Sequence, residues 1–243
     1  MHVGFFHTFL EDNFGNRTYN KHMNKLKAFY KWIIENYCKG FNNPFDIPDK
    51  KVQANVETIE ENEFYELLER ITPENGIAIS STAKKKTKRN FYAPFLKSGF
   101  LLALHTGGRR EEVANLKWDM IKEKAGYPLY IDIPNLKVER AKKAEGENVV
   151  APKIIPITKG LHQILLKLDY QNKKGLDQYI ICPDRSKYST STIMEKLSKG
   201  FSHYFKQLDT DRELQFKCLR KTFLTYLEHT VKGDTKSLSS HAS

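Results

Sequence analysis

Apolar residues recur at the spacing of an α-helix along most of this chain and at the spacing of a β-strand in only one region. The clearest helical pattern advances in alternating steps of three and four residues through Tyr19, Met23, Leu26, Tyr30, Ile33 and Tyr37. This pattern predicts a helix with one buried face, with Thr18 at its start and Gly40 just past its end. Residues 41–56 hold Asn and Pro without apolar periodicity, which indicates a linker. We therefore expect two units.

The remainder of the chain predicts further helices and a little sheet. Thr58 followed by Glu61 has the form of a capping box. Helical patterns continue at 64–68, 91–104, 113–120, 161–168, 190–208 and 218–226. The stretches 129–138 and 154–157 favour strands, and the lysine-rich stretch between them predicts the long turn of a β-hairpin. The expected fold class is mainly α with a small antiparallel β-sheet.

Charge makes nucleic acid the leading candidate partner. The chain carries 40 Lys and Arg against 29 Asp and Glu, a formal charge of +11, and an anionic membrane surface is the competing explanation. No apolar run approaches the length of a membrane span. Residues 1–15 do not have the pattern expected of a secretory signal. The three cysteines suggest neither a disulfide framework nor a zinc site. A cytoplasmic location is therefore expected.

Four positions carry residue types that suit phosphate chemistry. In the first, Gly107 and Gly108 precede Arg109 ahead of a predicted helix, which favours an anion and a bidentate arginine contact. In the second, Lys217 and Arg220 lie three residues apart and share a helix face. The third consists of hairpin lysines and the fourth is a histidine near the end of the sequence, namely Lys137, Lys142, Lys143 and His241. For each position alone, the alternative is an ordinary solvated loop, helix face or turn.

Taken in order and at these spacings, the four positions resemble the motifs of the tyrosine recombinases, the phage integrase family. Residues 106–112, followed by Leu116 and Trp118, match that family's T-G-x-R-x-x-E and L-x-W pattern. Residues 217–225 match H-x-L-R-H-T-F-x-T, with lysine at both histidine positions. Residues 239–243 resemble L-G-H-x-S, with Ser240 in place of glycine. The resemblance covers nearly the whole chain.

The resemblance implies an enzyme that breaks and rejoins DNA at specific sites through a 3′-phosphotyrosyl intermediate, without a metal or nucleotide cofactor. Arg109 and Arg220 would then clamp the scissile phosphate. Lys137 would protonate the departing 5′-oxygen if nearby arginines lower its pKa, with Lys142 and Lys143 as alternatives. Further roles would fall to Lys217 and His241 at the phosphate, to Glu112 in support of the arginines, and to Lys84, Lys85, Lys86, Lys88, Arg89, Lys142, Lys143 and Lys221 as DNA contacts. The bland alternative for the run 84–89 is a solvated loop.

The same resemblance implies two domains. Residues 1–45 would form a helical, SAM-like core-binding domain that is incomplete at its N-terminus. Residues 46–57 would be a linker, and residues 58–243 a catalytic domain of α+β type. The family's nucleophilic tyrosine follows the histidine of the third motif, whereas this sequence stops two residues after His241. We therefore expect a fragment that ends before its nucleophile, with Tyr204 and Tyr226 as core or surface aromatics.

The partners expected from the resemblance are double-stranded DNA and further copies of the chain, as a tetramer on DNA in the intact protein, with no membrane. One alternative is a DNA-binding protein of the same fold without strand-transfer activity. A membrane-associated or structural protein would explain the charge but none of the four motifs.

Overall fold

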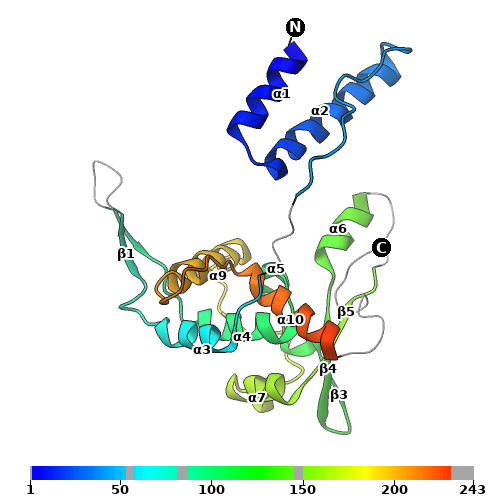
Figure 1. Cartoon of the computed structure of the whole chain (residues 1–243). Coiled ribbons are helices and arrows are strands. Elements are labelled where there is room, and N and C mark those ends of the chain that lie inside the picture. The colour runs from blue at the N-terminus through cyan, green and yellow to red at the C-terminus, as the bar shows by residue number, and fades with distance from the viewer. Residues whose placement is uncertain (1, 53–56, 81–86, 145–149, 231–243) are drawn as a thin grey trace. The chain divides into compact units, whose positions relative to one another are not determined.

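The computed structural model describes residues 2–52, 57–80, 87–144 and 150–230. The chain divides into two compact units, Met1–Asn55 and Val56–Ser243 (Figure 1). Each unit has its own hydrophobic core, so each is able to bury its apolar residues without the other.

The smaller unit consists of helices α1 (His2–Asn13) and α2 (Asn16–Asn36). Helix α2 confirms the helix predicted from apolar spacing, although it begins after Gly15 rather than at Thr18. Burial along its apolar stripe declines from Tyr19, which is buried, to Tyr37, which is 72% exposed. Helix α1 was not predicted, because its apolar side chains do not keep to one face and Phe5 is 79% exposed.

The segment that follows α2 packs back against both helices. Phe45 lies in the core of this unit. The Asn20 side chain donates to the Lys50 carbonyl at 2.8 Å and accepts from the Lys50 amide at 2.9 Å. The Lys50 ammonium also pairs with Glu11 at 2.7 Å. The packed chain thus extends to residue 50, beyond the end expected at residue 45.

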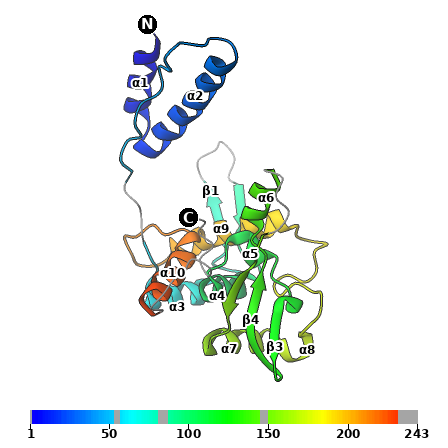
Figure 2. The same cartoon turned by 90° about the vertical axis from the view of Figure 1, so that its right-hand side faces the viewer.

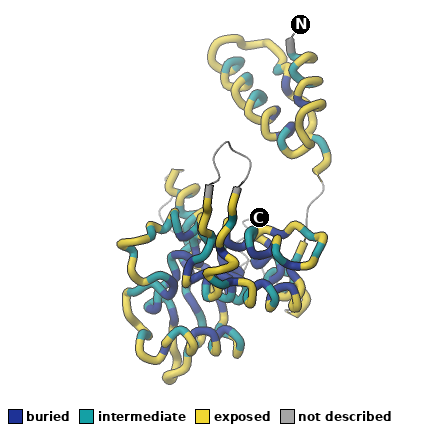
Figure 3. The backbone as a smooth tube through the Cα atoms, turned by 90° about the vertical axis from the view of Figure 1, so that its left-hand side faces the viewer, coloured by how far each residue is buried: buried dark blue, intermediate teal, exposed yellow. Residues whose placement is uncertain are grey.

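The larger unit is built around helix α4 (Leu96–Thr106). The helices around it are α3 (Glu61–Arg70), α5 (Arg110–Ala114), α6 (Leu136–Ala144), α7 (Lys159–Lys167), α8 (Tyr170–Lys173), α9 (Thr190–Phe205) and α10 (Lys217–Thr230). Helix α4 contacts α5, α7, α9 and α10, and its Phe100 ring packs edge-on against Phe201 and Phe216 with centroids 5.4 and 5.9 Å away. Figure 3 shows buried positions concentrated in this group of helices.

Two short antiparallel sheets complete the larger unit (Figure 2). Strands β3 (Ile121–Lys124), β4 (Tyr127–Ile133) and β5 (Lys153–Pro156) pair in that order. Strands β4 and β5 pair antiparallel as predicted, but β4 ends at Ile133 and helix α6 lies in the connection where a long turn was expected. The second sheet, β1 (Ile77–Ser80) with β2 (Thr87–Asn90), includes the end of the basic run 84–89 that was interpreted as a possible loop. The expectation of a single sheet is therefore wrong.

Local boundaries differ from the predicted ones for identifiable reasons. Helix α3 begins after Glu60, whose amide donates to Glu63 at 3.0 Å, so the capping interaction lies two residues later than Thr58 and Glu61. Helix α4 begins after Pro94, because a proline disfavours helical geometry in the residue before it. The helix predicted at 113–120 is replaced by the short α5 and a 3-10 turn, Trp118–Met120.

Candidate active site

The loop after α4 has a conformation that requires glycine. The Thr106 hydroxyl donates to the Leu102 carbonyl at 2.6 Å and accepts from the Gly108 amide at 3.1 Å. Gly107 has φ of +57°, and a Cβ added there would lie 2.3 Å from the Phe223 ring of α10. Gly107 therefore lets the end of α4 approach α10 closely.

Arg109 and Glu112 form the start of α5. The Glu112 carboxylate accepts from the Arg109 amide at 2.7 Å and from Arg109 Nη1 at 2.8 Å. Arg109 Nη1 also lies 3.4 Å from the Asn135 side-chain oxygen. Because Glu112 is 3% exposed, these contacts fix the arginine from inside the protein. These contacts are the ones that the supporting role predicted for Glu112 would require. The role itself stays a prediction.

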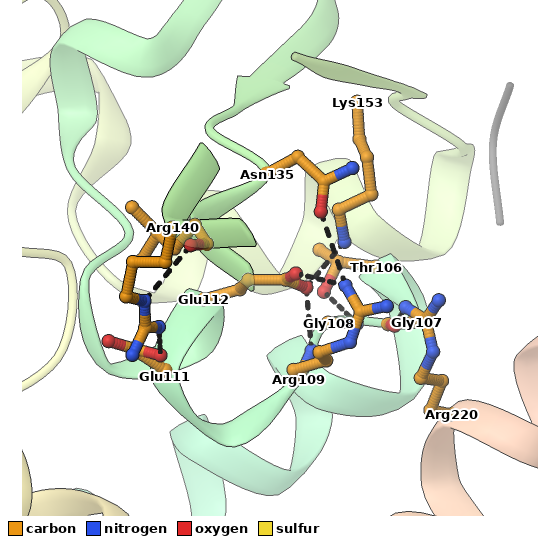
Figure 4. A network of polar contacts seen from close by, with 11 residues as sticks. Thr106, Gly107, Gly108, Arg109, Glu111, Glu112, Asn135, Arg140, Lys153 and Arg220 are labelled. Carbon is orange, nitrogen blue, oxygen red and sulfur yellow. Dashed lines mark hydrogen bonds and ion pairs between the residues drawn. The ribbon is translucent and has the colours of Figure 1, made fainter. Parts of the chain in front are cut away.

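The second partner of Glu112 is Lys153, the first residue of β5. The Lys153 ammonium forms an ion pair with Glu112, and both side chains are 2% exposed. Figure 4 shows this ammonium above the carboxylate, with Arg109 and Arg220 next to it. Lys153 reaches the site because β5 alternates its side chains, with Lys153 and Ile155 on the buried face and Ile154 on the exposed face.

The electrostatics of this cluster follow from its burial. Burial lowers the pKa of Lys153, the charges of Arg220 and Arg109 lower it further, and Glu112 opposes both effects. Burial alone would raise the pKa of Glu112, but the ion pair with Lys153 and the bonds from Arg109 lower it overall. Burial, together with the charge of Arg109, lowers the pKa of Arg220. One carboxylate thus stabilises three clustered cations.

Arg220 lies on α10 and bonds through Nη1 to the Gly107 carbonyl, which joins the two arginine motifs. Arg109 and Arg220 line one cleft of about 840 Å³. Its other cationic lining residues are Arg89, Arg110, Lys199, Lys206 and Lys217. None of the described residues that line this cleft is acidic. The arrangement suits a polyanion, and the paired guanidinium groups suit a phosphate in particular.

The structure places the other predicted site residues in different parts of the larger unit. Lys217 lines the cleft at the start of α10, and Lys221 lies half-buried one turn later. Lys137, Lys142 and Lys143 lie on helix α6, so the expectation of a strand end and a turn is wrong. Within the described residues, no hydrogen bond or ion pair joins Lys137 to the Arg109–Glu112 pair.

The basic run 84–89 and His241 lie partly at the cleft and partly outside the described residues. Arg89 lines the cleft, whereas its neighbour Lys88 is exposed and does not. His241, Lys84, Lys85 and Lys86 lie outside the described residues.

The two internal tyrosines fit the interpretation that neither is the nucleophile. Tyr204 is buried, its hydroxyl donates to the Thr72 carbonyl at 2.9 Å, and burial raises its pKa to about 12. Tyr226 is 64% exposed on α10. It follows Arg220 by six residues, which turns it roughly 120° around the helix from that arginine.

Sequence reasoning missed Lys153 and Asn135. A signal for Lys153 was present, because the apolar alternation of 154–157 extends back by one residue and places Lys153 on the same face as Ile155. Lys153 was not included in the predicted strand because lysine is charged and is rarely found on a buried strand face. Asn135 precedes α6, which was not predicted, so nothing in the sequence indicated its approach to Arg109.

The described part of the chain offers neither a candidate metal site nor a candidate membrane span. It contains no group of three or more His, Cys, Asp or Glu that could hold a metal ion. It also contains no helix long and apolar enough to cross a membrane.

Solved structures provide the comparison that identifies the fold. The chain is similar to lambda integrase in a tetramer bound to a Holliday junction, with TM-score 0.67 and 16% identity over 99% of this chain and 63% of that one. A lambda integrase dimer bound to a COC′ core site gives TM-score 0.65 and 15% identity, over 99% of this chain and 78% of that one. The Tn1549 transposon integrase with circular intermediate DNA gives TM-score 0.56 and 16% identity, over 98% and 76%. The chain has the fold of the tyrosine recombinases.

This result confirms the expected fold class, which is mainly α with a small antiparallel sheet. The structure adds a second small sheet to the one expected. The chain spans 63% of the length of the first lambda integrase structure. No protein-family model and no curated protein sequence matches the chain.

Proposed function

We propose that this chain belongs to a site-specific tyrosine recombinase and binds double-stranded DNA in the cleft of Arg109 and Arg220. The observation that carries the proposal is the meeting of these two arginines, from separate motifs, in one cleft lined by seven cations. The lambda and Tn1549 integrases were solved with DNA, which agrees with this partner. The electrostatic character of the cleft matches the phosphate backbone of a duplex.

The proposed reaction is the attack of a tyrosine oxygen on the scissile phosphorus, with the phenolic proton passing to solvent. The new bond joins that oxygen to phosphorus, and the bond from phosphorus to the 5′-oxygen breaks. Negative charge grows on the non-bridging oxygens in between. Arg109 and Arg220 are positioned to donate to those oxygens, because Glu112 and the Gly107 carbonyl hold their guanidinium groups before substrate arrives. Such preorganised donors typically contribute about 10²–10³ in rate each.

The departing 5′-oxygen needs a proton, and we assign that proton to Lys153 in place of Lys137. The Lys153 ammonium lies in the arginine cluster, and burial lowers its pKa toward the range that suits a general acid. Lys137 is exposed on α6. The roles of Lys217 and His241 at the phosphate and the tetramer on DNA stay predictions.

The DNA-binding part of the proposal is tested by fluorescence anisotropy with a labelled duplex. Wild-type affinity should fall with salt by about 0.9 logarithmic units per phosphate contact for each tenfold increase. Arg220→Ala and Arg109→Lys should weaken binding. Arg70→Ala is the matched control, because Arg70 lies on α3, pairs with Glu66 and does not line the cleft. Binding that is absent, or that is insensitive to salt, would contradict the proposal.

The chemical part is tested on the protein translated from the whole reading frame, with a nicked suicide duplex. A covalent protein–DNA adduct should form, and Arg220→Ala should abolish it. Lys153→Ala should slow adduct formation, and a sulfur atom at the 5′-bridging position should restore the rate, because a thiolate leaves without a proton. If the sulfur atom restored the rate of Lys137→Ala and not that of Lys153→Ala, Lys137 would be the acid. DNA binding without any adduct would favour a binding protein of the same fold.

A further inference from the structure

The β1–β2 hairpin has two chemically different faces. Residues directly opposite each other on the two strands share a face, and the register pairs Ala78 with Arg89 and Ile79 with Lys88. Ala78 and Arg89 both line the cleft, whereas Ile79 and Lys88 do not. Ile79 is 68% exposed on the face away from the cleft. The register and the cleft lining therefore agree on which face of the hairpin is turned toward the arginine cluster.

The base of this hairpin is held firmly by helix α9. The Phe91 amide donates to the Gly76 carbonyl at 2.8 Å, and the Phe91 ring stacks on His203 with centroids 4.4 Å apart. The Asn75 carbonyl accepts from Gln207 at 2.9 Å and lies 2.7 Å from His203 Nε2. These contacts fix the direction in which the two strands leave the unit.

The strands beyond this base project away from the body of the unit, as Figure 1 shows. Among the described residues, no other strand pairs with either of them. A two-stranded hairpin is marginal alone in water, so these strands gain most from a partner that contacts them. A two-stranded ribbon also has dimensions that the major groove of a duplex accepts.

The charges beside the hairpin define that partner as an anion. Arg89 shares the cleft wall with Lys199 and Lys206 of the α9 region, and none of the described lining residues is acidic. Lys199 already pairs with Glu195, whereas no ion pair is recorded for Arg89 within the described part of the chain. Arg89 is exposed, so its guanidinium can reach a ligand without disturbing the core.

We propose that the β1–β2 hairpin is a second DNA-contacting element, in which Arg89 binds a backbone phosphate that flanks the one held by Arg109 and Arg220. This inference rests on the proposed function and extends it to a hairpin that lies outside the two arginine motifs in sequence but lines the same cleft. Arg89 is a positioning residue for DNA and takes no part in the bond changes.

The test compares Arg89→Ala with Lys88→Ala, adjacent exposed residues that lose the same charge from opposite faces. Binding of a labelled duplex is measured by anisotropy between 50 and 200 mM salt. Loss of one phosphate contact should weaken Arg89→Ala about 15-fold at 50 mM and about fourfold at 200 mM, with the salt slope reduced by about 0.9. Lys88→Ala should lose less than half as much slope, and Arg89→Lys should keep most of it.

Each outcome separates this inference from the proposed function. If wild-type protein fails to bind DNA, the proposed function fails and this inference with it. If Arg220→Ala weakens binding but Arg89→Ala stays within twofold of wild type at 50 mM, the hairpin proposal alone is overturned. Equal losses for Arg89→Ala and Lys88→Ala would also overturn it, because they would show no difference between the two faces. Unchanged circular dichroism spectra would confirm that the variants remain folded.

Discussion

Removing the charge of Glu112 should destabilise the larger unit more than removing the charge of Lys153, although the two residues form one ion pair. The asymmetry comes from the remaining contacts. Without the Glu112 charge, Lys153 stays buried beside Arg109 and Arg220 with no anion. Without Lys153, Glu112 still accepts from the amide and from Nη1 of Arg109 at 2.7 and 2.8 Å. Loss of the Glu112 charge should therefore lower the stability of the larger unit more than loss of the Lys153 charge.

The structure sets the magnitudes. Glu112→Gln breaks a buried pair and leaves an uncompensated cation, which costs about 3–5 kcal/mol of unfolding free energy. Lys153→Met removes one charge-assisted hydrogen bond but fills the same space, so the loss should be about 1.5–3 kcal/mol. The double variant removes both the carboxylate at position 112 and the ammonium at position 153, so neither member of the ion pair is left without the other. Its loss should fall below the sum of the two single losses by about 2 kcal/mol, within the range for residues in contact.

Urea unfolding at pH 7, followed by tryptophan fluorescence, measures these losses in the larger unit, because Trp118 is buried there whereas Trp32 is half exposed. Additive losses within about 0.5 kcal/mol would refute the coupling. The pH dependence provides a second measurement. Because the folded pKa of Glu112 lies below 4.5, its stabilisation is present above pH 4.5 and is lost as pH falls through the folded value. Glu112→Gln should therefore show a shallower loss of stability in acid.

Two further predictions concern residues near the site and the reactive thiols. Gly107→Ala should destabilise by about 1–3 kcal/mol, because it combines a left-handed backbone with a clash against Phe223. Gly126→Ala is the matched control, since φ is +80° there but nothing lies within 4 Å of the added Cβ, and thermal unfolding should show the smaller effect. In thiol labelling at pH 8, exposed Cys38 should react at once, while burial raises the pKa of Cys218 to about 12 and should delay its labelling until urea unfolds the chain. Equal labelling rates, measured by peptide mass spectrometry, would contradict the burial of Cys218.

The sequence allowed prediction wherever the local pattern and the tertiary packing favour the same structure. The apolar stripe of α2 follows helical spacing, and the structure forms that helix over Asn16–Asn36. The strand-like stretches at 129–138 and 154–157 pair as β4 and β5. Arg109 and Glu112 meet because they lie three residues apart at a helix start, where a carboxylate returns to the capping amide. These features depend on interactions between residues close in sequence or on simple periodicity.

Prediction failed where a polar segment takes its structure from contacts elsewhere. Strands β1 and β2 are four residues each and mostly exposed, so their sequence lacks the apolar alternation that marks a strand. Their base is fixed by α9, more than 100 residues later in the chain. Helix α6 has no buried residue and is joined to α5 by the ion pair of Arg140 with Glu111. No local pattern contains these long-range contacts.

Lys153 illustrates why residue type alone misplaces the lysine that we propose as the proton donor. A lysine in a polar stretch is expected in solvent, and Lys137, Lys142 and Lys143 satisfy that expectation on α6. Lys153 is instead buried, which is acceptable only because Glu112 lies opposite its ammonium. One carboxylate cannot neutralise Lys153, Arg109 and Arg220 together, so the cluster keeps a surplus of positive charge at the edge of the cleft. Burial lowers the pKa of Lys153 and of Arg220, and repulsion among the clustered cations lowers it further, so an anion bound between the arginines would relieve part of this cost. This surplus of positive charge supports the proposal that the cleft binds a phosphate.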